Sequence, residues 1–356
     1  MCLLLLALAA TEAGAKSLIE MGWDEPDPAF MRAHLAQIEA QPFDGVVYHI
    51  GGDRGGNDAR GLTGAFTWKA WGRRRWSEAE LAGDLRDLQA IRWTKFRHNF
   101  LRVNITPADI DWFDDYSSVL ANLTLAASIA RRAGSRGILL DTESYESPAF
   151  AYPKQRGKHS FKETQDQVRR RGAEVMRAFE KGYPGITLFL TLGGTYADMQ
   201  RWGSRIEFDK GGYGLLPAFV EGLVDGASPS AKIVDGMEGA YIVRKPSEVE
   251  DYFAAHERYA RTTRDPAKYR KTVSRGLGLW LDFDWRNRKW DPAKPESNYH
   301  TPEALRKSLR RALELSDEYV WLYGETALWW TKGGGRYKLP DAYVEAVRKA
   351  REGLAP

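Results

Sequence analysis

Short apolar segments alternate with longer amphipathic segments along this chain. The apolar segments are continuously hydrophobic, as in residues 186–190, which is typical of parallel strands covered on both faces. The segments between them carry apolar residues at helical spacing. We therefore predict eight strands, each followed by a helix, at residues 17–23, 45–50, 99–105, 137–143, 186–193, 233–238, 277–283 and 319–325.

Helix start signals follow several of these strands. Asp27 and Thr301 each precede a proline and an amphipathic segment, which predicts a capped helix with proline in its first turn. Serine followed three residues later by glutamate, at Ser77 and Ser160, predicts two capping boxes.

Eight strand–helix units without an evident linker predict an α/β fold, a single (βα)8 TIM barrel over residues 16–356 with long, aromatic-rich βα loops. A doubly wound open sheet is the alternative fold. Its usual nucleotide signature, Gly-x-Gly-x-x-Gly after the first strand, is absent, because that strand runs into Gly22, Trp23 and Asp24.

Composition narrows the class of protein. The 356 residues include 52 basic and 48 acidic ones, and this small excess of positive charge gives no nucleic-acid footprint. Residues 1–15 contain an apolar stretch and then small residues, which predicts an export signal whose start is truncated, and hence a periplasmic or extracellular protein. No other segment has the roughly 18 apolar residues of a membrane span. Oligomeric state stays open.

Acidic residues end most of the predicted strands. Asp141 and Glu143 lie one residue apart, so both point to the same face of the fourth strand. In a barrel, the carboxyl ends of the strands converge on one rim, where catalytic groups gather. Paired acids can differ in pKa and so divide acid and base roles, as glycosidic bond cleavage requires. The catalytic candidates are Glu143, Asp141, Glu238, Asp282 and Glu325.

Aromatic and hydrogen-bonding residues accompany these acids on the predicted rim. Aromatic rings suit the C–H faces of sugars, and polar side chains suit their hydroxyl groups. Arg102 fits either a substrate contact or an ion pair with a rim acid. The binding candidates are Trp23, Asp24, His49, Arg102, Asn104, Tyr145, Asp235, Trp285, Tyr323 and Trp330. No histidine cluster predicts a metal site, and no motif implies a cofactor, although a carboxylate site for Mg²⁺ or Ca²⁺ stays open.

The fourth strand, ending Leu140-Asp141-Thr142-Glu143, resembles the Asp-x-Glu ending of chitinase-like and lysozyme-like members of the (βα)8-barrel glycoside hydrolases. The resemblance implies that Glu143 protonates the leaving oxygen and that Asp141 orients Glu143 or stabilises the reacting centre. It does not extend to the sixth strand, where Asp235-Gly236-Met237-Glu238 stands in place of Tyr-Asp. Glu238, Asp282 and Glu325 are therefore equal candidates for the partner of Glu143.

These features predict a glycoside hydrolase that cleaves a polysaccharide or oligosaccharide by carboxylate acid/base catalysis. A carbohydrate-binding barrel without turnover is a second interpretation, and a metal-dependent sugar isomerase or lyase is a third. The expected partner in each case is a carbohydrate.

Overall fold

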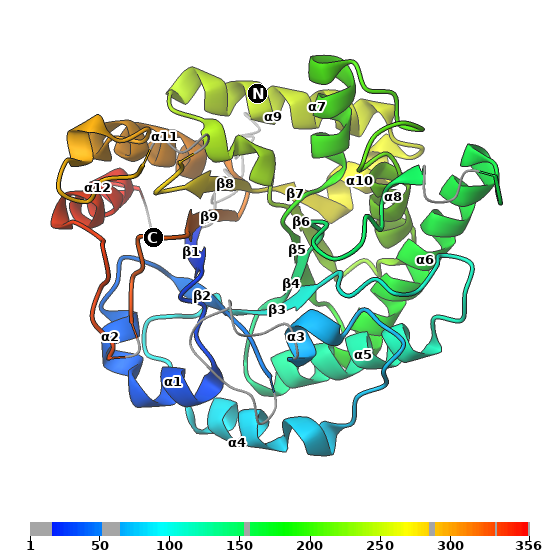
Figure 1. Cartoon of the computed structure of the whole chain (residues 1–356), viewed down its shortest axis with the longest axis horizontal. Coiled ribbons are helices and arrows are strands. Elements are labelled where there is room, and N and C mark those ends of the chain that lie inside the picture. The colour runs from blue at the N-terminus through cyan, green and yellow to red at the C-terminus, as the bar shows by residue number, and fades with distance from the viewer. Residues whose placement is uncertain (1–15, 52–64, 153–156, 285–288, 332, 355–356) are drawn as a thin grey trace, which may run out of the picture.

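The computed structural model describes residues 16–51, 65–152, 157–284, 289–331 and 333–354. The predicted signal segment, most of the loop after the second strand and Trp285 lie outside these ranges. In Figure 1, helices surround a ring of strands, as the alternating sequence pattern predicted. Strands of one parallel sheet form this ring in the order β7-β6-β5-β4-β3-β2-β1-β9-β8. The (βα)8-barrel prediction is confirmed.

The strands fall within or close to their predicted positions. They are β1 (Ser17–Gly22), β2 (Gly45–Tyr48), β3 (Phe100–Asn104), β4 (Gly137–Asp141), β5 (Thr187–Leu190), β6 (Lys232–Asp235), β7 (Val273–Arg275), β8 (Leu277–Trp280) and β9 (Tyr319–Gly324). Each pairing in the sheet is parallel, and β1 pairs with both β2 and β9.

The seventh predicted strand begins earlier and is divided in two. β7 pairs with β6, whereas β8 pairs with β9, and Gly276 separates the two segments. A Cβ at Gly276 would lie 2.9 Å from Val234 Cγ1 and 3.1 Å from Tyr319 O, so glycine suits this crowded junction. Because the chain continues through Gly276, β7 and β8 together take the place of one barrel strand. This strand pairs with β6 on one side and with β9 on the other, which closes the barrel.

The helices that follow the strands cover the outside of the barrel. They are α1 (Pro28–Ala33), α2 (Leu35–Glu39), α3 (Phe66–Lys69), α4 (Ala82–Ala90), α5 (Ser117–Arg132), α6 (Phe161–Gly182), α7 (Gly194–Ser204), α8 (Leu216–Gly226), α9 (Pro246–Thr262), α10 (Pro266–Thr272), α11 (Pro302–Leu315) and α12 (Asp341–Arg351). In the described ranges, 3₁₀ helices lie at Glu78–Leu81, Glu238–Ile242 and Pro295–Ser297.

The predicted helix starts are confirmed. The side chains of Asp27 and Thr301 accept hydrogen bonds from the backbone N–H groups of Phe30 and Ala304. Capping boxes form at Ser160, where α6 begins, and at Ser77, which precedes a 3₁₀ helix leading into α4. Among the described residues, no helix is long and apolar enough to cross a membrane.

The barrel has an inner and an outer apolar core. The inner core contains Ile19, Met21, Val47, Phe100, Leu139, Phe189, Val234, Tyr319 and Trp321. Phe100 lies edge-to-face against both Phe189 and Tyr319, at centroid distances of 5.5 and 5.4 Å. These rings fill the interior below the rim, so the interior is packed and is no open pore.

Candidate functional site

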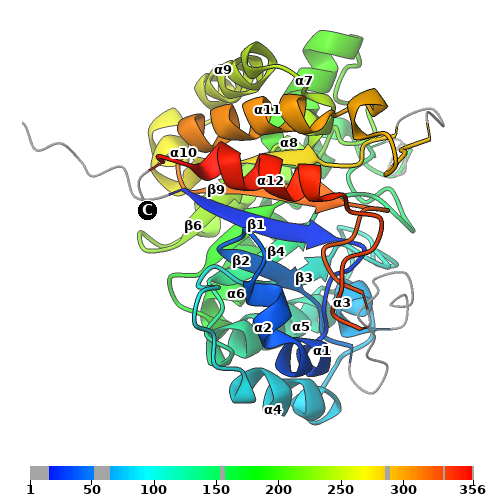
Figure 2. The same ribbon diagram turned by 90° about the vertical axis from the view of Figure 1, so that its left-hand side faces the viewer.

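Strand alternation carries polar side chains from the inner core to the rim. Side chains two residues apart share a face of a strand. Phe100 is therefore followed on the inner face by Arg102 and Asn104, and Leu139 by Asp141. Figure 2 shows the barrel from the side, with its strands pointing toward one end. At that end, the apolar interior gives way to charged and hydroxyl groups.

Arg102 lies at the centre of a buried ion network. Its guanidinium donates to Glu25 Oε2 over 2.7 Å and to Asp141 Oδ2 over 2.6 Å. Burial opposes the charge of Arg102, but Glu25 and Asp141 outweigh this effect and hold the pKa of the guanidinium well above its ordinary value. His49 extends the network, since its Nδ1 lies 3.8 Å from Glu25 Oε1. Arg102 thus forms ion pairs with two rim acids, and an ion pair with a rim acid is one of its two predicted roles.

Asp141 is held by hydrogen bonds to both carboxylate oxygens. Besides Arg102, the donors to Oδ2 are Asn104 Nδ2 at 2.9 Å and the Tyr145 hydroxyl at 3.0 Å. Oδ1 accepts from the backbone N–H of Glu143 at 3.1 Å and from Thr191 Oγ1 at 3.2 Å. The Asp141 side chain is 1% exposed and held by these hydrogen bonds. Its bond from the Glu143 backbone N–H therefore helps to orient Glu143.

Glu143 and Glu238 form an interacting pair of carboxyl groups across β5. Burial and the charge of Asp141 raise the pKa of Glu143, while a hydrogen bond from Tyr145 and the charge of Arg102 oppose this shift. Burial raises the pKa of Glu238 well above its ordinary value, and the charge of Glu143 adds to the effect. Two carboxyl groups that interact in this way favour a state in which they share one proton.

The surroundings of the two carboxyl groups differ. Glu238 Oε2 is buried and has no hydrogen-bond partner among the described residues. An ionised oxygen without a donor is costly in such a position, whereas a neutral carboxyl group is tolerated. Thr191 and Tyr241 hydrogen-bond to Glu238, but burial outweighs their effect on its pKa. Glu143 lies near the positive charge of Arg102 and beside the Tyr145 hydroxyl, whose single proton is also given to Asp141. The shared proton is therefore favoured on Glu238.

A tight turn after β6 presents Glu238 at the rim. Gly236 N donates to Leu190 O at 2.9 Å, and Glu238 N donates to Thr191 O at 3.0 Å. Met237 between them is left-handed, with φ of 44°, although it is buried and carries a side chain. Left-handed backbone at a non-glycine residue costs free energy and is common beside functional groups. The Asp235 carboxylate supports the turn by accepting from Met237 N at 3.2 Å.

Tyrosines surround the glutamate pair. Those whose pKa responds to the charge of Glu143, Glu238 or both are Tyr145, Tyr196, Tyr213, Tyr241 and Tyr323. Burial raises the pKa of each, so their hydroxyl groups remain protonated donors at neutral pH. Tyr241 stacks on Tyr323 at 5.4 Å, and both rings rest against Trp280. Together they offer flat apolar faces and hydroxyl edges next to the two acids.

Several predicted site residues instead stabilise the rim. The carboxylate of Asp282 accepts from the Trp280 indole and from the backbone N–H groups of Glu325, Thr326 and Ala327. Asp235 accepts from Thr195 Oγ1 at 2.8 Å in addition to Met237 N. These acids hold loops in place, and their carboxylate oxygens already accept hydrogen bonds from those loops.

Asp24 and Trp330 form another structural contact. Asp24 Oδ2 accepts from the backbone N–H groups of Trp329 and Trp330, and the Trp330 indole donates to Asp24 O. Burial raises the pKa of Asp24 to about 7. Trp330 is 1% exposed, so its ring belongs to the core and has no free face for a sugar.

The remaining predicted residues lie near the rim in different settings. Trp23 is half-buried and packs against Trp68, whose ring lies 5.2 Å from the Arg102 guanidinium carbon and 4.9 Å from the Tyr145 ring. Glu325 is exposed, and its backbone N–H belongs to the Asp282 contact. Trp285 lies outside the described residues. Within the described ranges, no three His, Cys, Asp or Glu side chains gather in a way that could hold a metal ion.

Sequence reasoning missed part of this site. Tyr241 and Tyr196 were not among the expected binding residues, and Glu25 was not recognised as a partner of Arg102. Tyr241 falls three residues after Glu238, on the same 3₁₀ helix, and this spacing was the available signal.

Comparisons with known proteins identify the fold alone. No family model matches the chain, and no curated protein does. A GH5_18 protein from Streptomyces cattleya in complex with GlcNAc has a similar structure, with a TM-score of 0.52 and 13% identity over 96% of this chain and 82% of its own. A broad-specificity GH5-4 endoglucanase from an uncultured bacterium gives a TM-score of 0.52 and 12% identity over 93% and 86%. Both structures share the (βα)8 barrel fold with this chain.

Proposed function

We propose that this protein is a glycoside hydrolase in which Glu143 and Glu238 are the catalytic residues. The single observation that carries the proposal is the buried carboxyl group of Glu238 after β6, whose pKa is raised further by the charge of Glu143 after β4, within a rim of tyrosine hydroxyl groups. Cleavage of a glycosidic bond needs one neutral and one ionised carboxyl group. Glu238, with its pKa raised well above the ordinary value, suits the neutral role, and Glu143, beside the positive charge of Arg102, suits the ionised one.

The roles follow from the surroundings of each carboxyl group. Glu238 donates its proton to the leaving oxygen as the glycosidic bond breaks. Ionised Glu143, oriented by Asp141 and Tyr145, either attacks the anomeric carbon or takes a proton from the attacking water. This division of roles reverses the one that the Asp-x-Glu resemblance implies, because burial raises the pKa of Glu238 well above its ordinary value, whereas the charge of Arg102 opposes the rise at Glu143.

The substrate class follows from the walls of the site. Tyrosine rings and hydroxyl groups suit a polysaccharide or oligosaccharide, since each ring covers a sugar face while its hydroxyl binds at the edge. Asn104 Oδ1 and the Trp68 indole N–H are buried without hydrogen-bond partners among the described residues, and a sugar hydroxyl would satisfy either one. We also propose that the protein is exported, which the pattern of residues 1–15 supports.

Aryl glycosides with different leaving groups test these roles. A dinitrophenolate leaves without protonation, so Glu238→Gln should hydrolyse dinitrophenyl glycosides at close to the wild-type rate. The same variant should lose about 10²- to 10⁴-fold on unactivated saccharides. Glu143→Gln should fail on both. Equal losses on both substrates in Glu238→Gln would contradict the acid role, and unchanged activity in both variants would contradict the function.

A further inference from the structure

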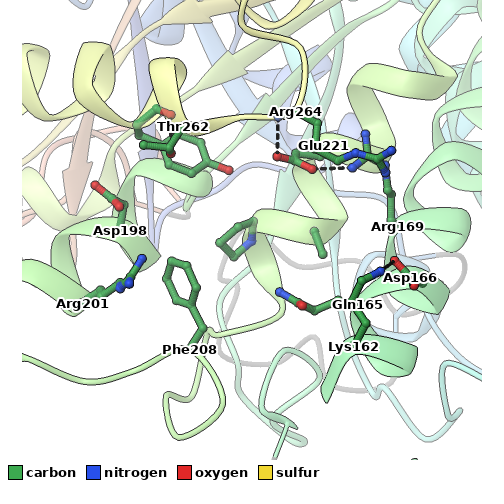
Figure 3. A pocket seen from close by; sticks show the side chains of 13 residues that line it. Lys162, Gln165, Asp166, Arg169, Asp198, Arg201, Phe208, Glu221, Thr262 and Arg264 are labelled. Atoms are coloured by element: carbon green, nitrogen blue, oxygen red, sulfur yellow. Dashed lines mark hydrogen bonds and ion pairs between the residues drawn. The ribbon is translucent and has the colours of Figure 1, made fainter. Parts of the chain in front are cut away.

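A cavity on the outer wall of the barrel lies apart from the glutamate pair. Its volume is about 690 Å³, within the range of small-molecule sites. In Figure 3, Asp198 and Arg201 of α7 lie on one side of it, and Lys162, Gln165 and Arg169 of α6 lie on the other. Phe208, from the segment after α7, also lines it.

The charged groups of this cavity are mostly paired with one another. Arg169 bonds to Glu221 at 2.5 Å and to Asp225 at 2.6 Å. Lys162 Nζ donates to Asp166 Oδ1 at 2.6 Å, and Arg201 Nε lies 3.6 Å from Glu207 Oε2. Because Lys162, Arg169 and Arg201 already have carboxylate partners, Arg264 is the one lining cation without an ion pair among the described residues, and the excess positive charge that could attract an anion is small. The cavity instead offers both hydrogen-bond donors and hydrogen-bond acceptors.

Aromatic and hydroxyl groups complete the lining. The Tyr259 side chain is 3% exposed, and its hydroxyl has no hydrogen-bond partner among the described residues. A buried hydroxyl without a partner is unfavourable, and a hydrogen bond to a ligand oxygen would satisfy it. The Arg201 guanidinium carbon lies over the Phe208 ring, 5.3 Å from its centroid, so the cation holds one face of the ring and the other is available to a ligand. Flat rings beside carboxylate, amide and hydroxyl groups are the chemistry that binds neutral sugars.

Helix α7 connects this cavity with the glutamate pair. Tyr196 and Asp198 are two residues apart, which places them on nearly opposite sides of a helix. Tyr196 packs toward Gly239, the residue after Glu238, while Asp198 lines the cavity. We propose that the cavity is a second saccharide site, which holds a neutral polysaccharide chain on the outer wall beside the rim. The choice of a saccharide rests on the proposed function.

Affinity electrophoresis tests this second site. The wild type, Phe208→Ala and Tyr259→Phe would be run in gels containing glucomannan, mixed-linkage β-glucan or glycol chitin. Tyr259→Phe removes only the hydroxyl, so it preserves the fold and its packing. Tyr337→Ala, at an aromatic residue 47% exposed, is the control for loss of a surface ring. We expect at least one glycan to retard the wild type and Tyr337→Ala, with about three- to tenfold weaker binding in the two cavity variants.

Hydrolysis of a small aryl glycoside separates this proposal from the function itself. It should proceed at the wild-type rate in Phe208→Ala and Tyr259→Phe, because neither residue belongs to the catalytic rim. Binding that depends on Phe208 in a protein without hydrolase activity would uphold the second site and contradict the proposed function. Retardation by none of the three glycans, or equal retardation of wild type and cavity variants, would overturn the second site. Retardation by anionic dextran sulfate alone would also overturn it.

Discussion

Arg102 donates to Asp141 over 2.6 Å while its other terminal nitrogen donates to Glu25, so one buried cation holds two rim acids. Asp141 in turn accepts from the backbone N–H of Glu143. The position of the Glu143 backbone therefore depends on the ion pair between Arg102 and Asp141. This dependence gives the first prediction.

Arg102→Met should destabilise the fold by about 3–5 kcal/mol, because it leaves Glu25 and Asp141 as buried charges without a cation. Chemical denaturation measures this free energy of unfolding. Arg275→Met is the matched control, since the Arg275 and Asp317 side chains are 39% and 37% exposed. Its cost should stay within about 1 kcal/mol. Equal losses in the two variants would show that the buried Arg102 network contributes no more to stability than the exposed Arg275 ion pair does.

Tyr145→Phe should move the acidic limb of the pH–activity profile to higher pH. The Tyr145 hydroxyl lowers the pKa of Glu143, so its removal raises that pKa and protonates the base at a higher pH. Tyr183→Phe is the control, because its hydroxyl donates to Ser135 O, before β4 at the opposite end of the barrel. If the acidic limb of Tyr145→Phe stays at the wild-type pH, Tyr145 does not influence the pKa of Glu143.

Glu238→Gln should change how stability depends on pH. The pKa of Glu238 is raised in the folded state above its ordinary value of 4.5, so the folded protein retains a proton that the unfolded chain releases. The wild type therefore loses stability as pH rises from about 4.5 toward the raised pKa. Glu238→Gln lacks this loss and should gain in melting temperature relative to wild type over that interval.

An exposed glutamate provides the control for this measurement. Glu345 pairs with Lys349 at the surface, where both side chains are about half exposed. Glu345→Gln should follow the wild-type dependence of melting temperature on pH. Parallel curves for wild type and Glu238→Gln would show that Glu238 titrates normally, which would exclude it as the acid at neutral pH.

Gly236→Ala should reduce activity strongly, because Gly236 begins the turn that presents Glu238. An added Cβ would lie 2.3 Å from Leu190 O, so the turn must shift. We expect a loss of stability of about 1–3 kcal/mol and a fall in kcat of about 10²-fold from the displaced acid. Gly203→Ala, where a Cβ meets no atom within 4 Å, is the control. Wild-type kcat in Gly236→Ala would mean that the turn does not position the acid.

The sequence predicted the barrel well because strand alternation and helix caps are local signals. The same alternation predicted that Asp141 and Glu143 share a face. It could not separate Glu238 from Asp282, since each is an acid at the end of a strand. The difference depends on distant backbone: Asp282 accepts N–H groups from the segment after β9, whereas Glu238 Oε2 accepts none. The buried position of Trp330 likewise depends on Asp24, far away in the chain.

The most direct test of the central claim is a reducing-end assay on a broad panel of soluble polysaccharides. Wild type, Glu143→Gln, Glu238→Gln and the control Glu345→Gln would be compared at equal concentration. We expect the wild type and Glu345→Gln to release reducing ends from at least one glycan, and either rim variant to lose about 10²-fold or more. Hydrolysis that survives in both rim variants would contradict the assignment of Glu143 and Glu238 as the catalytic pair.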